Sequence, residues 1–424
     1  MILVLACSLI LFMALSMPIA VALGFSSLLA LLHRGEPAMM LASSAFESLD
    51  SFSLLAVPFF ILAGNLMQKG GIARRLVNLA QAIVGWITGG LGAVVVLTSM
   101  FFATMSGSSS ATAAAIGSMV IPEMEKKGYP RRFAAAITAS SGELGVIIPP
   151  SIPMIIYATS MNVSIGDLFI AGILPGILIG LSLILTVYII SRRMGYDRGN
   201  GIGLRTWILE LGPAVRDSVF AIIMPVLILG GIYTGWFTPT EASVIAVVYG
   251  VIVGIYVYKE LRWRELLEIF GRSALISSVV LLLVAFASIF AYILTINQVP
   301  QKVGAAIAAF SDDPIVFLLL INILLFVVGM FMETLASIMI LGPILAPVAV
   351  MYGIDPMHFG VIMIVNLAVG MVTPPVGINL FIVCQVARVS MERLMRPLLI
   401  FLGVLIVDVL IISYLPSLSL ILIQ

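Results

Sequence analysis

Long apolar segments alternate with short polar ones along the whole chain. A helix needs roughly 20 apolar residues to cross the hydrocarbon core of a bilayer, and somewhat fewer where protein encloses it. On this criterion we predict membrane-spanning helices at 2–16, 19–33, 52–68, 134–160, 168–191, 218–236, 240–258, 273–296, 357–386 and 397–416. Residues 1–33 also fit one long tilted helix, and that alternative stays open.

Two further apolar segments, at 88–122 and 314–350, are too long for a single crossing. Each contains a polar or glycine-rich interruption near its middle, where a helix is expected to end. We therefore predict two re-entrant helical hairpins, each of which enters the membrane and returns to the side from which it came.

The distribution of Lys and Arg supports the two hairpins. The loop after the first hairpin contains Lys126, Lys127, Arg131 and Arg132, whereas Met351 to His358 contains no Lys or Arg. Further basic clusters are Arg192, Arg193, Arg198 and Arg205, then Lys259, Arg262 and Arg264, then Arg388, Arg393 and Arg396. Only the hairpin topology puts all these clusters on one side, which the positive-inside rule identifies as cytoplasmic.

The two hairpin regions also match each other at a fixed offset of 225 residues. The matching residues are all Gly or Pro: Gly117 with Gly342, Pro122 with Pro347, Gly128 with Gly353, Gly145 with Gly370, Pro149 with Pro374 and Pro150 with Pro375. Such residues shape the backbone rather than fill a lipid-facing surface. Because the basic loop follows only the first copy, we predict inverted repeats, which are typical of secondary transporters.

Composition indicates that lipid is the main solvent of this chain. Of its 424 residues, 62% are apolar and 10% are charged, against about half and a quarter in an average soluble domain. The fold class we predict is an all-α polytopic membrane protein. A net charge of +1 gives no sign of nucleic-acid binding, and two cysteines indicate no disulfide framework.

The predicted turn of the first hairpin is rich in hydroxyl groups, in the sequence MSGSSSAT at 105–112. Hydroxyl side chains and freed carbonyls at membrane depth are costly against lipid but suit the closed end of a water-accessible cavity. There they can hold a small cation, and helix N-terminal N–H groups can hold a carboxylate. The alternative is a close helix–helix contact made by small residues.

Tandem prolines interrupt the helix that follows each hairpin, at Pro149–Pro150 and at Pro374–Pro375. A proline removes an amide donor and so frees carbonyl oxygens, which are suitable ligands for sodium. Two similar ion sites, one in each repeat, would follow. Glu143 and Glu333 are intramembrane ionisable residues, and each could bind a proton or a cation or pair with a polar neighbour.

Several other functional classes fit poorly. The chain contains no HExxH, GxSxG or Walker A motif, and its two histidines leave little acid–base chemistry near neutral pH. We therefore do not expect an enzyme or an ATP-driven pump. A channel would need one continuous polar lining, whereas the polar residues here concentrate at two hairpin turns. Secondary transport is the predicted function.

The chain resembles the large membrane subunit of the tripartite ATP-independent periplasmic (TRAP) transporters, the DctM type. The segments that carry the resemblance are DSFSLLAVPFFILAG at 50–64, MSGSS at 105–109, IPPSIP at 148–153, FTPTEA at 237–242, GMFME at 329–333 and TPPVG at 373–377. They extend over nearly the whole chain. In GMFME, Glu333 stands where Asp is frequent in the family, and Leu335 follows where a hydroxyl residue is frequent.

The resemblance implies a sodium-driven importer of an organic acid, such as a C4-dicarboxylate, sialic acid or another sugar acid, in the bacterial inner membrane. It further implies an elevator mechanism, a small four-helix membrane subunit and a periplasmic binding protein as partners, and no cofactor beyond the coupling ion. A stand-alone sodium- or proton-coupled organic-anion carrier or antiporter of the same superfamily is the alternative.

The resemblance also implies a division of the chain and a set of site residues. Scaffold helices at 1–87 and 168–312 would flank transport-domain halves at 88–167 and 313–388, followed by a C-terminal helix at 389–424. One sodium site would involve Ser106, Gly107, Gly145, Ile148 and Pro150, and the other Gly329, Gly370, Thr373 and Val376. The substrate would lie near Ser108, Ser109, Thr334 and Asn366.

Overall fold

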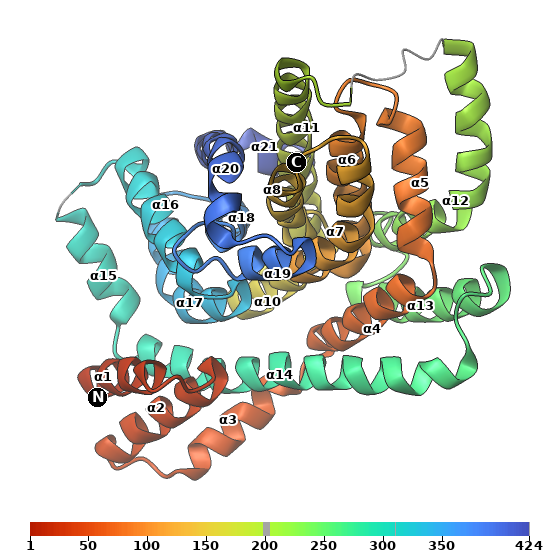
Figure 1. Cartoon of the computed structure of the whole chain (residues 1–424). Helices are drawn as coiled ribbons and strands as arrows, with labels where there is room; N and C mark the ends of the chain where they lie inside the picture. Colours follow the sequence, from red (N-terminus) through yellow and green to blue (C-terminus); the bar gives the residue numbers. More distant parts are fainter. Residues whose placement is uncertain (198–203, 310, 424) are drawn as a thin grey trace.

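The structure is a computed structural model that describes residues 1–197, 204–309 and 311–423. Every regular element within those ranges is a helix, so the predicted all-α fold is confirmed (Figure 1). Nine of the described helices are long and apolar enough to cross a membrane. Arg198, one of the basic residues used for the topology, lies outside the described residues.

The chain begins with two separate helices, α1 (Ile2–Ala14) and α2 (Ile19–Arg34), rather than one long tilted helix. A third helix, α3 (Met39–Leu49), leads through a short 3₁₀ turn at Phe52–Leu55 into α4 (Ala56–Lys69). Helix α5 (Ile72–Val84) follows. Our list of membrane spans does not include α3 or α5, because both are short and polar on one side.

The predicted span at 273–296 is the second half of a much longer helix, α14 (Trp263–Ile296). Figure 1 shows α14 running across the bottom of the view, beside α2, α3 and α4. Its 34 residues correspond to about 51 Å at 1.5 Å per residue, whereas the hydrocarbon core is about 30 Å thick. The helix therefore either tilts strongly or extends beyond the core.

Each predicted hairpin consists of two helices joined by a sharp turn. The first comprises α6 (Gly90–Ser106) and α7 (Ser109–Lys126), and the second α16 (Pro314–Phe331) and α17 (Thr334–Met351). The predicted helix breaks are also present. They separate α8 (Arg131–Gly142) and α9 (Leu144–Ile147) from α10 (Ile152–Met161), and α18 (Pro356–Met371) from α19 (Ile378–Ala387).

The internal repeat is confirmed and extends well beyond the segment where Gly and Pro residues match. Adding 225 to the bounds of α7 gives 334 and 351, which are the bounds of α17. The same offset places α6 on α16, α10 on α19 and α5 on α15 (Val299–Ala308), each within two residues. The segment from α5 to α10 and the segment from α15 to α19 are therefore built on one plan.

The remaining helices are α11 (Ile165–Met194), α12 (Leu204–Tyr233), α13 (Pro239–Ile252) with a π turn at Val253–Val257, α20 (Met391–Tyr414) and α21 (Ser417–Leu420). Helix α13 begins with a capping box: the Glu241 N–H donates to the Thr238 hydroxyl at 3.3 Å, and the Thr238 N–H donates to the Glu241 carboxylate at 2.8 Å.

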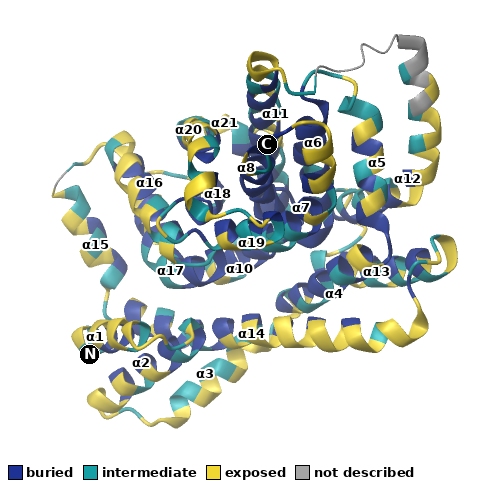
Figure 2. Cartoon of the chain, viewed as in Figure 1, coloured by how far each residue is buried: buried dark blue, intermediate teal, exposed yellow. Residues whose placement is uncertain are grey.

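The hairpins and broken helices form an inner unit that α11 and α20 complete. Helix α11, which we expected among the scaffold helices, packs against α6, α18 and α20. Figure 2 shows α8 and α10 of the inner unit largely buried, whereas α16 of the same unit and the outer helices α12 and α14 expose many residues. The outer helices α1–α5 and α12–α14 pack mainly on one another. This inner unit is the part of the chain that carries both helix breaks.

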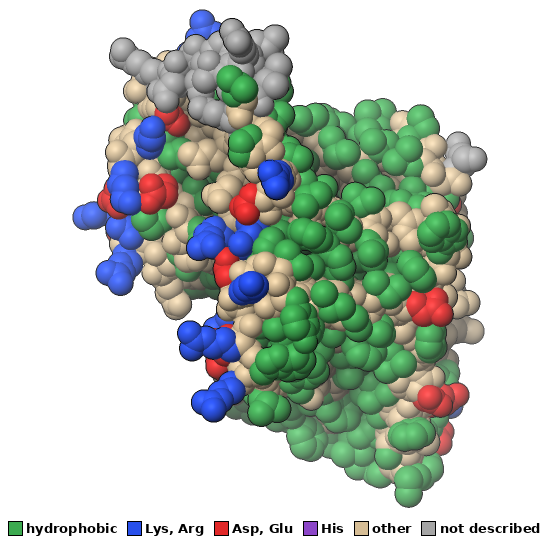
Figure 3. All heavy atoms as spheres, turned by 90° about the vertical axis from the view of Figure 1, so that its right-hand side faces the viewer, with side chains coloured by type: hydrophobic (Ala, Val, Ile, Leu, Met, Phe, Trp, Pro, Cys, Tyr) green, Lys and Arg blue, Asp and Glu red, His purple; other side chains and the backbone are tan. Residues whose placement is uncertain are grey.

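The surface has the pattern expected of a membrane protein. Figure 3 shows Lys and Arg side chains gathered along one edge, a broad hydrophobic area beside them, and Asp and Glu side chains near the opposite edge. Exposed large side chains such as Leu181, Leu185 and Ile323 contribute to the hydrophobic surface of the outer faces. The apolar area between two polar edges is the surface that lipid would cover.

A pair of polar side chains ties the first arm of each hairpin to the following broken helix. Ser99 on α6 lies 3.2 Å from Ser141 on α8, and Asn366 on α18 donates from its Nδ2 to Asn322 Oδ1 on α16 at 2.8 Å. Ser141 and Asn366 are repeat equivalents. Both repeats thus hold hairpin and broken helix together with a buried polar contact.

Two glycines allow α16 and α18 to approach each other closely. A Cβ atom at Gly370 would lie 2.6 Å from the Cα atom of Gly329, and one at Gly329 would lie 2.8 Å from the carbonyl oxygen of Leu367. Neither contact can be relieved by a side-chain rotation, because both partners are backbone atoms. The second hairpin therefore depends on glycine at these positions.

We expect Gly370→Ala to destabilise the protein by about 1–3 kcal/mol, because the added methyl group would push α16 away from α18. Thermal unfolding of the detergent-solubilised protein measures this. Gly403→Ala in α20 is the matched control, since no atom lies within 4 Å of a Cβ there. Equal midpoints for the two variants would show that the close approach is not required.

Candidate functional site

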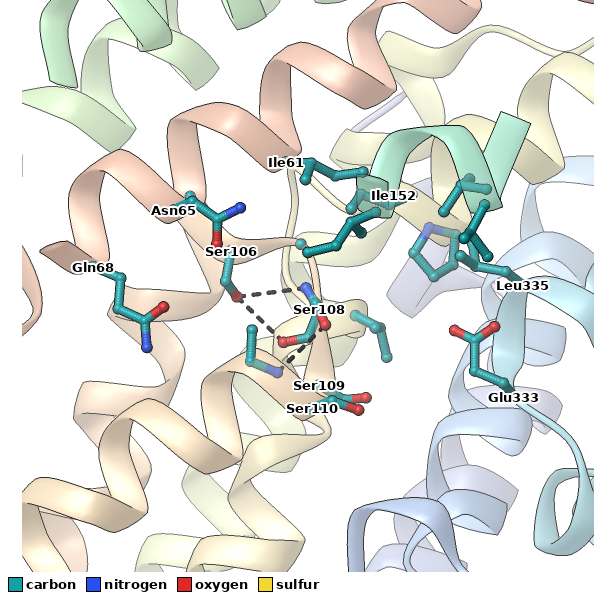
Figure 4. A pocket seen from close by; sticks show the side chains of 18 of the residues that line it. Ile61, Asn65, Gln68, Ser106, Ser108, Ser109, Ser110, Ile152, Glu333 and Leu335 are labelled. Carbon is teal, nitrogen blue, oxygen red and sulfur yellow. Dashed lines mark hydrogen bonds between the residues drawn. The ribbon is translucent and has the colours of Figure 1, made fainter. Parts of the chain in front are cut away.

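A cavity of about 380 Å³ lies where the two hairpin turns face the outer helices. The first turn contributes Ser106 to Ala111, and the second contributes Glu333 and Leu335. The outer wall comes from α4, with Asn65 and Gln68, and from apolar residues of α14. Figure 4 shows Asn65 and Gln68 on one side of the serine turn and Glu333 with Leu335 on the other.

Hydroxyl and carbonyl oxygens crowd together at the first turn. Gly107 has a φ of +57°, which reverses the chain between α6 and α7, and Ser108 is the N-cap of α7. The Ser106 and Thr112 hydroxyls lie 2.7 Å apart, and Thr112 also donates to the Ser108 carbonyl at 2.8 Å. Thr112 was not among the predicted site residues.

The first turn is seated directly on the first helix break. A Cβ atom at Gly107 would lie 3.4 Å from the carbonyl oxygen of Pro150. A Cβ atom at Gly145 would lie 2.5 Å from the carbonyl oxygen of Ser108 and equally close to the Thr112 hydroxyl. The structure therefore brings Ser106, Gly107, Gly145 and Pro150 together, as the predicted first ion site requires.

The prolines free two carbonyl groups at this break. Pro149 and Pro150 have no N–H, so the carbonyls of Gly145 and Val146 lose the donor that a continuous helix would supply. The Ser151 hydroxyl donates to the Val146 carbonyl at 2.6 Å. The freed Gly145 carbonyl is therefore the stronger candidate for an ion ligand. Ile148 lies at the break, and its side chain packs where α11 has Gly176.

The second turn repeats this local arrangement with different side chains. Glu333 takes the place of Ser108 as N-cap, and the Ser337 hydroxyl donates to the Glu333 carbonyl at 3.0 Å, as Thr112 does to Ser108. The Gly377 N–H donates to the Met330 carbonyl at 3.1 Å, so this turn also lies on its helix break. Val376 is the residue directly before Gly377 in the chain.

Thr373 fixes the second break. Its hydroxyl donates to the Val369 carbonyl at 2.8 Å and its N–H donates to the Gly370 carbonyl at 2.9 Å. The two breaks differ in exposure, since Pro149 and Pro150 are buried whereas Pro375 is exposed. The structure therefore places the predicted residues Gly329, Gly370, Thr373 and Val376 at one break, which is more open than the first.

The four predicted substrate residues separate into two groups. Ser108 and Ser109 line the cavity. Thr334 is buried beside it, with its hydroxyl 3.0 Å from the Met371 sulfur. Asn366 does not reach the cavity, because its side chain donates to Asn322 and to the Ile362 carbonyl. Asn366 is therefore a structural contact between helices in this conformation.

Helix N-termini supply the positive potential of the cavity. Helices α7, α10 and α17 begin at its wall, at Ser109, Ile152 and Thr334. Their first N–H groups favour a bound anion. The residues that line the cavity include no Lys, Arg or His, and the carboxyl group of Glu333 lies at the start of α17. The serine turn at the start of α7 is consequently the better place for a carboxylate.

A buried polar chain that we did not predict connects the two repeats behind the cavity. The Ser110 hydroxyl donates to Asn379 Oδ1 at 2.8 Å, and Asn379 Nδ2 donates to a carboxyl oxygen of Glu143. Glu143 and Asn379 are both fully buried, and the second carboxyl oxygen of Glu143 has no partner among the described residues. Pairing with a polar neighbour was one predicted alternative for Glu143, but Asn379 was not identified from the sequence as that neighbour.

We expect Asn379→Leu to lower stability by about 1–3 kcal/mol, because Glu143 would lose the one side-chain hydrogen-bond donor that it has among the described residues. The thermal unfolding midpoint of the purified protein measures the loss. The double variant Glu143→Leu with Asn379→Leu should recover part of it, since no buried carboxyl group remains. If the double variant simply shows the sum of two losses, Asn379 does not act through Glu143.

The comparisons with known proteins agree with this architecture. Residues 6–418 match the family model described as "Tripartite ATP-independent periplasmic transporter, DctM component". A solved structure, that of the YdaH transporter of Alcanivorax borkumensis, has the same fold with a TM-score of 0.66. It is 16% identical, and the match covers 88% of this chain and 86% of the other.

Several curated relatives are similar over most of the chain. An isethionate TRAP transporter permease protein, DctMQ, of Oleidesulfovibrio alaskensis is 44% identical over 413 residues, which are 96% of this chain but only 64% of that protein. The C4-dicarboxylate TRAP transporter large permease protein of Pseudomonas aeruginosa is 42% identical over 399 residues, 94% of this chain and 92% of that one.

The sialic acid TRAP transporter large permease protein of Vibrio cholerae is 39% identical over 381 residues, 90% of this chain and 88% of that protein. Together with the family match, these identities extend over both hairpins and both helix breaks. The chain therefore belongs to the DctM component family of tripartite ATP-independent periplasmic transporters, a family of multi-pass transport proteins and not of enzymes.

Proposed function

We propose that this chain uses a sodium gradient to import an organic acid across a bacterial inner membrane, with a small membrane subunit and a periplasmic binding protein as partners. The observation that carries the proposal is the seating of each hairpin turn on a proline break, where freed carbonyl and hydroxyl oxygens converge. Family membership supports the transport role.

Sodium is the coupling ion that these oxygens fit best. No group of three or more His, Cys, Asp or Glu side chains that could hold a metal occurs in the part of the chain that the structure describes. The ligands available to a cation at the two breaks are carbonyl and hydroxyl oxygens, which suit a hard, weakly bound cation. The first site would use Ser106, Gly107, Gly145, Ile148 and Pro150 together with Thr112. The second would use Gly329, Gly370, Thr373 and Val376.

An acidic substrate fits the potential of the cavity. The relatives named above transport isethionate, C4-dicarboxylate and sialic acid according to their names, and each of these compounds is an organic acid. We propose that the acid group binds at the start of α7, near Ser108 and Ser109. Glu333 on the opposite wall would disfavour a second negative charge there. Its carboxyl group would accept hydrogen bonds from hydroxyl groups of the substrate.

Transport would occur by an elevator motion of the inner unit. The cavity lies between that unit and the outer wall formed by α4 and α14, so movement of one past the other would carry the cavity across the membrane. The residues that α14 contributes are Ile276, Val279 and Val280, which form no hydrogen bonds to the turns through their side chains. A smooth apolar wall of this kind favours sliding.

The expected partners follow from the family and from length. The isethionate relative, named DctMQ, is substantially longer than this chain, which covers 64% of it. The additional length of that relative supports a second membrane component for this chain. The periplasmic binding protein would deliver the organic acid to the outward-facing cavity.

Replacing sodium by potassium should abolish accumulation of the substrate in proteoliposomes that contain this chain, its small subunit and its binding protein. The two proposed oxygen sites are expected to select sodium over the larger potassium ion. Uptake of radiolabelled substrate under an imposed ion gradient measures this. Accumulation that continues in potassium and follows a proton gradient would overturn sodium coupling and favour a proton-coupled carrier.

Thr373→Val should raise the sodium concentration required for half-maximal uptake by about tenfold, since one oxygen at the second break would be lost. Ser118→Ala is a matched control, because its hydroxyl likewise donates to a carbonyl of its own helix, that of Ala115, at 2.9 Å. Sodium titrations of uptake that coincide for the two variants would argue against a site at Thr373.

A further inference from the structure

Four arginines line a second concave site, which shares no lining residue with the transport cavity. Arg131 and Arg132 come from the start of α8, and Arg388 and Arg393 flank the turn between α19 and α20, where Ser390 also contributes. The pocket has a volume of about 650 Å³. Two loops that lie in opposite repeats thus form one basic pocket.

Two helices begin at residues that line this site. Helix α8 has 12 residues and begins after Pro130, and α20 has 24 residues and begins after Ser390. Neither helix has an N-cap side chain that accepts a hydrogen bond from its first turn. Both N-termini therefore retain unsatisfied donors, which favour a bound anion.

The charge of the arginines is only partly neutralised within the protein. Arg131 donates to Glu125 at 3.0 Å, but its Nε atom is buried and has no hydrogen-bond partner. Arg132, Arg388 and Arg393 form no ion pair with any carboxylate of the described residues. Arg132, Arg388 and Arg393 are therefore available to donate to a phosphate group.

The surroundings favour a lipid over a free anion. The pocket belongs to the basic loops that the positive-inside rule assigns to the cytoplasmic side, where anionic phospholipid headgroups lie. Large apolar side chains are exposed on α19 and α20, the two helices that the Arg388–Ser390 turn joins. Phe381 on α19 is 51% exposed, and Leu399 and Ile400 on α20 are 57% and 50% exposed. Acyl chains could pack along this surface while the phosphate occupies the pocket.

We propose that this pocket binds the phosphate group of an anionic phospholipid in the cytoplasmic leaflet. Arginine guanidinium groups bind phosphate through paired N–H donors, and two helix N-termini add to the positive potential. Because α8 and α20 both belong to the inner unit, the lipid would attach that unit to the membrane surface. The proposal does not depend on sodium coupling or on the substrate.

The test uses the full chain purified in a neutral detergent and titrated with phosphatidylglycerol, phosphatidylcholine or sn-glycerol 3-phosphate. Thermal unfolding midpoints report stabilisation, and native mass spectrometry counts retained lipids. The pocket variant is Arg132→Gln with Arg393→Gln. Its matched control is Arg192→Gln with Arg193→Gln, which also removes two exposed arginines outside this pocket.

We expect phosphatidylglycerol to raise the midpoint of the unmodified protein and of the control variant, with at least a tenfold higher lipid concentration required for the pocket variant. The proposal is overturned if the pocket variant responds as the control does, or if phosphatidylcholine stabilises equally. Equal stabilisation by sn-glycerol 3-phosphate would identify a soluble anion instead of a lipid. Should the pocket variant fail to fold, native mass spectra of the unmodified protein that show no preference for phosphatidylglycerol would still refute the proposal.

Discussion

Every backbone N–H and carbonyl group inside a membrane needs a partner, and this requirement governs the centre of the molecule. Four helices end within the inner unit, two at hairpin turns and two at proline breaks. The structure satisfies them by placing each turn on a break. Gly107 approaches the Pro150 carbonyl, and the Gly377 N–H donates to the Met330 carbonyl. The same contacts leave a few oxygens available for an ion.

The close seating of turn on break explains where the chain requires its smallest residues. Gly145 has no room for a Cβ atom beside Ser108, and Gly370 has none beside Gly329. These glycines are repeat equivalents, and each precedes its tandem prolines by four residues. Close approach therefore occurs at the same residue in both repeats. The carbonyls differ, because the Gly370 carbonyl accepts a hydrogen bond from the Thr373 N–H at 2.9 Å, so the two proposed ion sites would not use identical ligands.

The two halves nevertheless differ in ways that suit different tasks. The first break is buried and its turn is rich in hydroxyl groups, whereas the second break exposes Pro375 and its turn presents Glu333. The cavity consequently has a wall with hydrogen-bond donors and a helix N-terminus, and an opposite wall with a carboxyl group. This asymmetry would give the proposed acidic substrate a preferred orientation between otherwise related elements.

Sequence patterns could predict most of this framework. The apolar periods, the Gly and Pro matches at 225 residues and the basic loops lead to the hairpins and the breaks, because these features are local. Side-chain contacts between residues far apart in the chain leave no such local pattern. Asn366 was expected at the substrate, but it pairs with Asn322, 44 residues earlier in the chain. Asn379 was missed because its partner Glu143 lies 236 residues away.

Helix α14 shows the same limit for a whole element. Its apolar half resembles an ordinary span, and the charged residues before it, such as Arg264 and Glu268, resemble a loop. The helix continues through these charged residues because this end of α14 is exposed, and charged side chains are well tolerated there. Only the packed structure shows that the wall of the cavity is part of so long a helix.

We propose that the two hairpin turns, where they lie on the helix breaks, form sodium sites within this chain itself. Thermal unfolding of the purified chain, titrated with sodium chloride against potassium chloride at constant ionic strength, tests it without partners or substrate. A ligand that binds only the folded state raises the unfolding midpoint with its concentration. We predict a saturable rise of the unfolding midpoint with sodium and none with potassium. Identical curves for the two salts would contradict it.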